Sequence, residues 1–120
     1  MTKLKLTGLV AATHTPFKAD GSLNLAAVEL QMEHLLGHDL ATAFVCGSTG
    51  ESQSLSFEER RQLTQRWMEA ARGTPLKVIV HVGSNCLPDA KALALQAEKL
   101  GAAAISTLAP HYFKPHSLEN

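Results

Sequence analysis

The stretch Ala43-Phe44-Val45-Cys46-Gly47-Ser48-Thr49-Gly50-Glu51 decides both the fold and the candidate site of this chain. An apolar run leads into a turn with two glycines, which permit a sharp bend and close approach of the backbone to a ligand. The two hydroxyls and the run of N–H groups offer donors to a carboxylate or a phosphate. The pattern therefore predicts a strand followed by an anion-binding turn; a turn that merely connects two elements is the alternative.

A helix is expected soon after this turn, because Ser56 and Glu59 have the spacing of a capping box. Outward from here, strand-like and helix-like segments alternate along the whole chain. Apolar runs predict strands at 9–15, 42–46, 77–82 and 103–108, and the 3.6-residue period predicts helices at 24–37, 56–72 and 88–100.

The predicted strands are continuously apolar rather than alternating, which is typical of a parallel sheet covered by helices. Right-handed crossovers place the carboxyl ends of all strands at one edge of such a sheet. The polar residues that follow the strands are therefore expected to meet at one rim, as catalytic residues do in a (β/α)8 barrel.

Composition limits the classes of function. The chain has 120 residues, 45% hydrophobic and 18% charged, which is the balance of a single globular domain. Its 11 basic and 11 acidic residues are scattered, so neither a nucleic-acid partner nor a membrane anchor is expected. The apolar run Leu9–Ala12 is too short for a signal-peptide core, and we expect a cytoplasmic protein. Cys46 and Cys86 lie far apart, and a disulfide is not expected.

The six histidines raise the question of a metal site. His34 and His38 have i, i+4 spacing but lack the glutamate of a zinc-protease motif, and Gly37 lies between them. His81 and His111 could face each other across the rim, yet a metal needs three or four ligands, so no metal is expected. Glu51 could serve as an acid or base, but a structural role before a helix is preferred.

Three segments resemble the dihydrodipicolinate synthase and N-acetylneuraminate lyase family. They are 8–17 (GLVAATHTPF), 47–60 with its GSTGE turn, and 109–115 (APHYFKP), in the order and spacing of the family. Together they span nearly the whole chain. Within the family, Val80-His81-Val82-Gly83 and 109–115 lean toward the N-acetylneuraminate lyase side.

The resemblance implies a class I aldolase without a cofactor, in which a lysine forms a Schiff base with pyruvate and a C–C bond to an aldehyde or sugar is made or broken. Gly47, Ser48 and Thr49 match the turn that binds the carboxylate of the 2-keto acid. Tyr112 matches a catalytic tyrosine of a proton relay that often reaches a neighbouring subunit. A homo-oligomer is also implied, since the family forms tetramers.

The chain departs from the family in two respects. His111 stands where many relatives carry an aromatic residue. The Schiff-base lysine of the family lies on a strand beyond the fourth, whereas this sequence stops at Asn120 and a (β/α)8 barrel needs roughly 250 residues. Residues 1–120 are therefore expected to be the amino-terminal half of a TIM-barrel aldolase domain. Lys114 alone lies near the rim, at a position that is not catalytic in the family.

Three functions stay open on the sequence. The first is an N-acetylneuraminate lyase-like enzyme, and the second is a condensing enzyme of the dihydrodipicolinate synthase type. The third is a non-catalytic half-barrel that self-associates, because four strands alone leave two open sheet edges. In that case Val45, Val80 and Ile105 are expected to point into the open barrel and face water.

Overall fold

A computed structural model describes residues 3–119. Four parallel strands form one sheet in the order β1-β2-β3-β4, so each strand lies beside the next one along the chain. The strands are β1 (Ala11–Ala12), β2 (Thr42–Val45), β3 (Lys77–His81) and β4 (Ala104–Ser106). The sheet is thus the open, sequentially ordered arrangement that the alternating pattern predicts.

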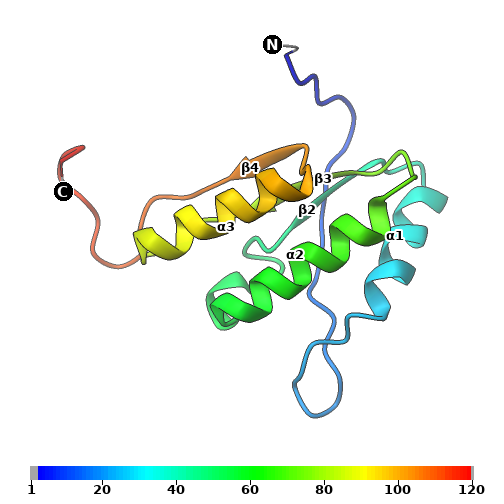
Figure 1. Cartoon of the computed structure of the whole chain (residues 1–120), viewed down its shortest axis with the longest axis horizontal. Helices are drawn as coiled ribbons and strands as arrows, with labels where there is room; N and C mark the ends of the chain where they lie inside the picture. Colours follow the sequence, from blue (N-terminus) through cyan, green and yellow to red (C-terminus); the bar gives the residue numbers. More distant parts are fainter. Residues whose placement is uncertain (1–2, 120) are drawn as a thin grey trace.

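Three helices connect the strands: α1 (Ala27–Gly37), α2 (Phe57–Ala71) and α3 (Leu87–Leu100), with a short 3-10 helix, η1 (Ser52–Ser54), before α2. Figure 1 shows α2 lying between α1 and α3, in front of the strands, in agreement with the contacts of α2 with both neighbours. Helix α2 begins with the predicted capping box, in which Ser56 Oγ accepts from Glu59 N and Glu59 Oε2 accepts from Ser56 N. At the end of α3, Gly101 takes the left-handed conformation with a φ of 82°.

The core lies between the helices and one face of the sheet. Trp67 and Leu63 of α2, Val28 of α1 and Leu93 of α3 are almost completely buried there. Val45 and Val80 are also buried, with exposures of 0% and 2%, because the register pairs them on the face that packs against the helices. The expectation that they would face water is therefore wrong.

The wrong assignment of Val45 and Val80 follows from the alternation of side chains along a strand. Successive side chains of a strand point to opposite faces, and both faces of this sheet are apolar, so the sequence alone does not say which set meets the helices. Phe44, Ile79 and His81 occupy the other face, where the Phe44 and His81 rings lie 6.2 Å apart. Ile105 pairs with Val80, so it also lies on the helix-facing side and not inside the open barrel, although on this edge strand it is 52% exposed.

The first strand is much shorter than predicted. Ladder pairing involves only Ala11 and Ala12, although Thr13 N still donates to Phe44 O at 3.1 Å. Residues 3–10 are exposed and form no strand. In Figure 1 they are the blue segment that extends away from the body of the molecule. Helix α1 also begins three residues late, because Asn24 and Leu25 first form tighter turns with Ala27 and Val28.

Candidate active site

The turn from Gly47 to Glu51 follows the carboxyl end of β2 and is closed by its own backbone. Glu51 N donates to Ser48 O at 3.0 Å, and Ser52 N donates to Gly47 O at 3.2 Å. Cys46 and Glu51, at its two ends, have left-handed backbones with φ near 60°. Such a conformation is unusual away from glycine, so the surrounding bonds hold the turn in one shape.

Contacts with the end of β1 fix this turn further. The hydroxyl of buried Thr15 donates to Gly50 O at 2.6 Å. A Cβ at Gly50 would lie 3.2 Å from Thr13 O and 3.3 Å from Cys46 backbone atoms, which is tighter than ordinary packing. The glycine is therefore needed for the approach of the turn to the first strand.

The donors of the turn point outward and are unused. Ser48 and Thr49 are exposed, and among the hydrogen bonds of residues 3–119 neither their hydroxyls nor their N–H groups take part. Gly47 is buried beneath them against the ring of Phe44. Glu51 is exposed and makes no side-chain cap to η1, so it is the backbone of this residue that shapes the turn. A rigid turn with free donors is suited to binding a carboxylate.

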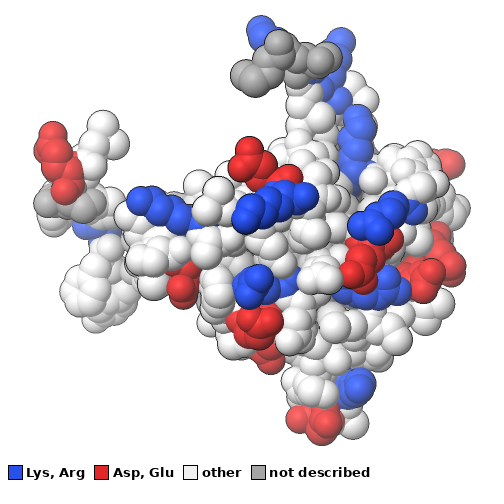
Figure 2. All heavy atoms as spheres, viewed as in Figure 1, with Lys and Arg blue, Asp and Glu red and all other residues white. Residues whose placement is uncertain are grey.

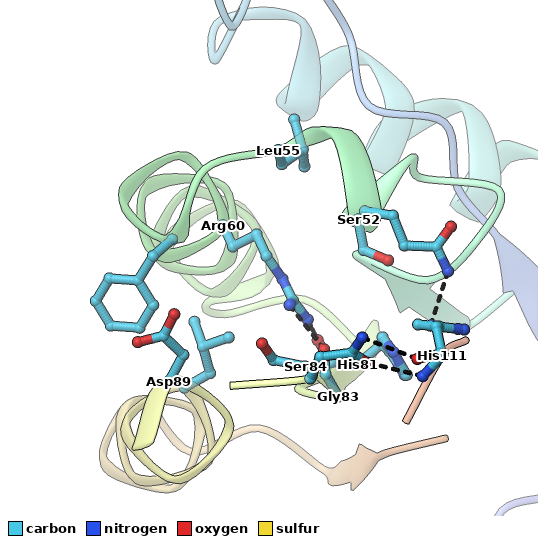
Figure 3. Close-up of a pocket in the computed structure, with 12 residues that line it drawn as sticks. Ser52, Leu55, Arg60, His81, Gly83, Ser84, Asp89 and His111 are labelled. Carbon is cyan, nitrogen blue, oxygen red and sulfur yellow. Dashed lines mark hydrogen bonds between the residues drawn. The ribbon is translucent and has the colours of Figure 1, made fainter. Parts of the chain in front are cut away.

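A cavity of about 510 Å³ lies beside the turn, where η1 meets α2, α3 and the segments that follow β3 and β4. Figure 3 shows Arg60 reaching across it from α2 toward Gly83. Its guanidinium donates to Gly83 O and to His81 O, each at 2.8 Å, while Arg60 Nε is buried with no partner among the described residues. Asp89, at the start of α3, also lines the cavity.

Burial controls the titration of three groups around the site. It is the main reason that the pKa of His81 is lowered, and electrostatic interactions with Arg60 and then with His111 lower it further. Burial also lowers the pKa of Arg60, although Asp89 opposes this shift. The pKa of the Cys46 thiol is raised to about 11, again by burial. His81 is therefore kept neutral and Cys46 protonated near pH 7.

The segment after β4 makes a second tight turn at the same rim. Phe113 N donates to His111 O at 2.9 Å across Tyr112, whose φ is 67°. These are features of the rare γ-turn with positive φ, and non-glycine residues in such backbone regions cost on the order of 1–3 kcal/mol. The Tyr112 ring is 90% exposed and packs edge-on against Phe113, with 4.8 Å between centroids.

Side chains from two other loops hold the residue before Tyr112. Asn85, after β3, accepts from His111 N at 2.7 Å and donates to His111 O at 3.1 Å. Gln53 of η1 lies 2.9 Å from His111 Nε2. The segments that follow β2, β3 and β4 are thus joined at His111, which Figure 3 shows at one side of the cavity.

The structure brings together only part of what the sequence singled out. His81 and His111 line one cavity, as expected, and Gly47, Ser48 and Thr49 form one turn. Tyr112 lies in the turn after β4 at the same rim, but no hydrogen bond joins it to Ser48 or Thr49 among the described residues. Lys114 is exposed. Sequence reasoning missed Arg60, Gln53 and Asn85, because their partners lie in other loops and no local spacing marks them.

Two further observations concern metals and membranes. No group of three or more histidine, cysteine, aspartate or glutamate side chains within residues 3–119 could hold a metal ion. None of the helices described is long and apolar enough to cross a membrane. On the face that Figure 2 shows, basic and acidic side chains are interspersed rather than gathered by sign.

Residues 5–120 match the model of the dihydrodipicolinate synthetase family. The chain belongs to this family. It is 46% identical to N-acetylneuraminate lyase A of Xenopus laevis over 116 residues, which are 96% of the chain and 38% of that protein.

Solved structures of the family give the same result. The N-acetylneuraminate lyase of Proteus mirabilis superposes with a TM-score of 0.89 at 41% identity, covering 96% of this chain and 39% of the lyase. A dihydrodipicolinate synthase from Aquifex aeolicus gives 0.86 at 32% identity, covering 92% of this chain and 37% of the synthase. The expected family and partial (β/α)8 barrel are confirmed, and the chain spans about two fifths of the length of these family members.

Proposed function

We propose that this chain supplies the carboxylate-binding part of a pyruvate-dependent lyase of the N-acetylneuraminate type. In this proposal Gly47, Ser48 and Thr49 bind the carboxylate of the 2-keto acid. The observation that carries it is the set of unused hydroxyl and N–H donors on a rigid turn at the carboxyl end of β2. Charge-assisted hydrogen bonds from such donors fix the orientation of a planar carboxylate as well as its position.

The carboxylate clamp has a defined task in this chemistry. A lysine amine condenses with the keto carbon and releases water, so the keto carbon must be held toward that amine. Residues 1–120 act here as the amino-terminal half of the barrel, and the lysine is supplied by a later strand. Tyr112 is the proton-relay residue, because a phenol can donate and accept within one hydrogen-bond network. Its position in the turn after β4 and its large exposed fraction support this role.

The proposal also covers the second substrate, the cellular compartment and the oligomeric state of the enzyme. The aldehyde or sugar partner binds beside pyruvate, and the working form is a cytoplasmic homo-oligomer. Two free cysteines, Cys46 and Cys86, agree with a reducing compartment. The large exposed fraction of Tyr112 agrees with a residue that meets a neighbouring subunit.

The condensing reaction of dihydrodipicolinate synthase uses the same pyruvate chemistry and is the second candidate, since a synthase superposes nearly as well as a lyase. A half-barrel that self-associates is the third candidate. Its support is the pair of open sheet edges, where Leu9 beside β1 and Leu108 beside β4 are both exposed. The third candidate requires no catalysis by the 120-residue chain.

Borohydride trapping with pyruvate tests the proposal. The isolated chain is compared with a chimeric barrel in which residues 5–119 replace the matching segment of the Proteus mirabilis lyase. We expect a covalent pyruvate adduct, detected by intact mass, in the chimeric barrel and not in the isolated chain. Cleavage of N-acetylneuraminate by the chimeric barrel then shows whether residues 5–119 support the lyase reaction.

Two variants make the test specific to the turn. Thr49→Ala should raise the pyruvate concentration needed for half-maximal trapping, whereas Ser54→Ala, which removes an exposed hydroxyl outside the turn, should not. A chimeric barrel that folds but traps no pyruvate would contradict the proposal. Sedimentation of the isolated chain tests the third candidate, which predicts a dimer or a larger species.

A further inference from the structure

Asn85 belongs to none of the motifs that identify the family. It lies in the short segment between β3 and α3, yet its side chain bonds to a residue 26 positions later. Its amide oxygen accepts from His111 N at 2.7 Å, and its amide nitrogen donates to His111 O at 3.1 Å. One side chain thus satisfies both backbone polar groups of His111.

The bonded residue is the first residue of the γ-turn around Tyr112. His111 O accepts from Phe113 N as well as from Asn85, so the same carbonyl closes the turn and anchors it. Tyr112 is left with a φ of 67°, which a tyrosine adopts only when its surroundings impose it. Among the described residues, the side-chain contacts that hold this conformation are the hydrogen bonds of Asn85 and Gln53 to His111.

Nothing else in the described part of the chain buries this turn. The side chains of Tyr112 and Phe113 are 90% and 83% exposed, so packing does not hold the backbone. The hydrogen bonds to His111 therefore hold the backbone from which the Tyr112 side chain extends.

We infer that Asn85 is a positioning residue for Tyr112, which it holds in the turn geometry that the proton relay requires. This inference rests on the proposed function of Tyr112. Asn85 touches no reacting atom and acts only through the backbone of His111. Gln53 of η1 adds a second hydrogen bond to His111, and it thereby links the segment after the proposed carboxylate-binding turn to the turn around Tyr112.

The test combines a structural and a kinetic measurement on Asn85→Ala, Asn85→Asp and Cys86→Ser. Alanine removes both bonds, aspartate keeps the acceptor for His111 N, and the exposed neighbour Cys86 controls for disturbance of the loop. Amide exchange of His111 and Phe113 is measured in the 120-residue chain and in the chimeric barrel. Steady-state kinetics are measured in the chimeric barrel.

With Asn85→Ala we expect exchange at these amides to rise by about tenfold and kcat to fall with little change in KM. Asn85→Asp should retain part of the protection, and Cys86→Ser should match the parent. Unchanged exchange in Asn85→Ala would overturn the inference.

The kinetic data separate the positioning role of Asn85 from the proposed relay role of Tyr112. If exchange rises and kcat holds, although Tyr112→Phe lowers kcat, then Asn85 does not position Tyr112 for the reaction and the inference fails. If exchange rises and neither Asn85→Ala nor Tyr112→Phe lowers kcat, the anchoring of the turn is upheld, and the relay role within the proposed function is what fails.

Discussion

The two turns at the rim reach similar backbone strain by different means. The turn after β2 is held by its own backbone bonds and by Thr15 beneath Gly50. The turn around Tyr112 is held by side chains of Asn85 and Gln53, which come from two other loops. A turn closed by its own backbone bonds presents its donors in fixed positions. A turn held by side chains of other loops can change its backbone conformation when those side chains are substituted.

The largest expected difference between these two regions is the rate at which their cysteines react with a thiol reagent. Cys46 leads into the first turn and is buried, with its pKa raised to about 11, while Cys86 is exposed beside Asn85. Because the thiolate is the reactive form, a thiol reagent at pH 8 should label Cys86 at least about a hundredfold faster. Mass spectrometry of the labelled peptides measures this ratio. Comparable rates would mean that the end of β2 is not packed as described.

Tyr112→Phe tests the chemistry of the second turn. Under the proposed relay role, removing the Tyr112 hydroxyl should lower kcat of the chimeric barrel by about a hundredfold. The yield of trapped Schiff base should change little, because the carboxylate clamp is intact. If KM rose and kcat held, Tyr112 would be a substrate contact instead.

Thr49→Ala tests the first turn, and its effect should be somewhat smaller. Loss of one hydrogen bond to a charged group is worth about 1.5–3 kcal/mol, which corresponds to roughly tenfold to a hundredfold weaker use of pyruvate. Pyruvate titration of the chimeric barrel measures the change, with Ser54→Ala as the control. Unchanged pyruvate kinetics would remove Thr49 from the site.

A smaller effect is expected from His81, whose backbone carbonyl Arg60 binds between the two turns. The pKa of His81 is lowered from 6.5 by burial and by nearby positive charge, so the unfolded chain binds a proton before the folded one does. Its contribution to stability is therefore present above about pH 6.5 and is lost as the pH falls toward the folded pKa.

Thermal unfolding of the chimeric barrel between pH 7.5 and 5.5 checks this sign. The parent should lose more stability on acidification than His81→Gln, which has no group to protonate there. An equal loss in the two proteins would show that other groups determine the acid response.

The contrast between the turns also explains what the sequence could predict. The strand, the Gly47–Glu51 turn and the capping box at Ser56 are local patterns, and the structure contains all three. The face of the sheet on which Val45 lies was predicted wrongly, because apolar residues occupy both faces. Arg60 and Asn85 were missed because their partners are backbone atoms of distant loops, which leave no mark on local spacing.

The central claim is that the turn after β2 binds the carboxylate of a 2-keto acid. A crystal structure of the chimeric barrel, trapped with pyruvate and borohydride, tests it most directly. The account predicts that the carboxylate oxygens lie within hydrogen-bond distance of the hydroxyl and N–H donors of Ser48 and Thr49. A carboxylate bound elsewhere, for example on the Arg60 guanidinium in the neighbouring cavity, would contradict it.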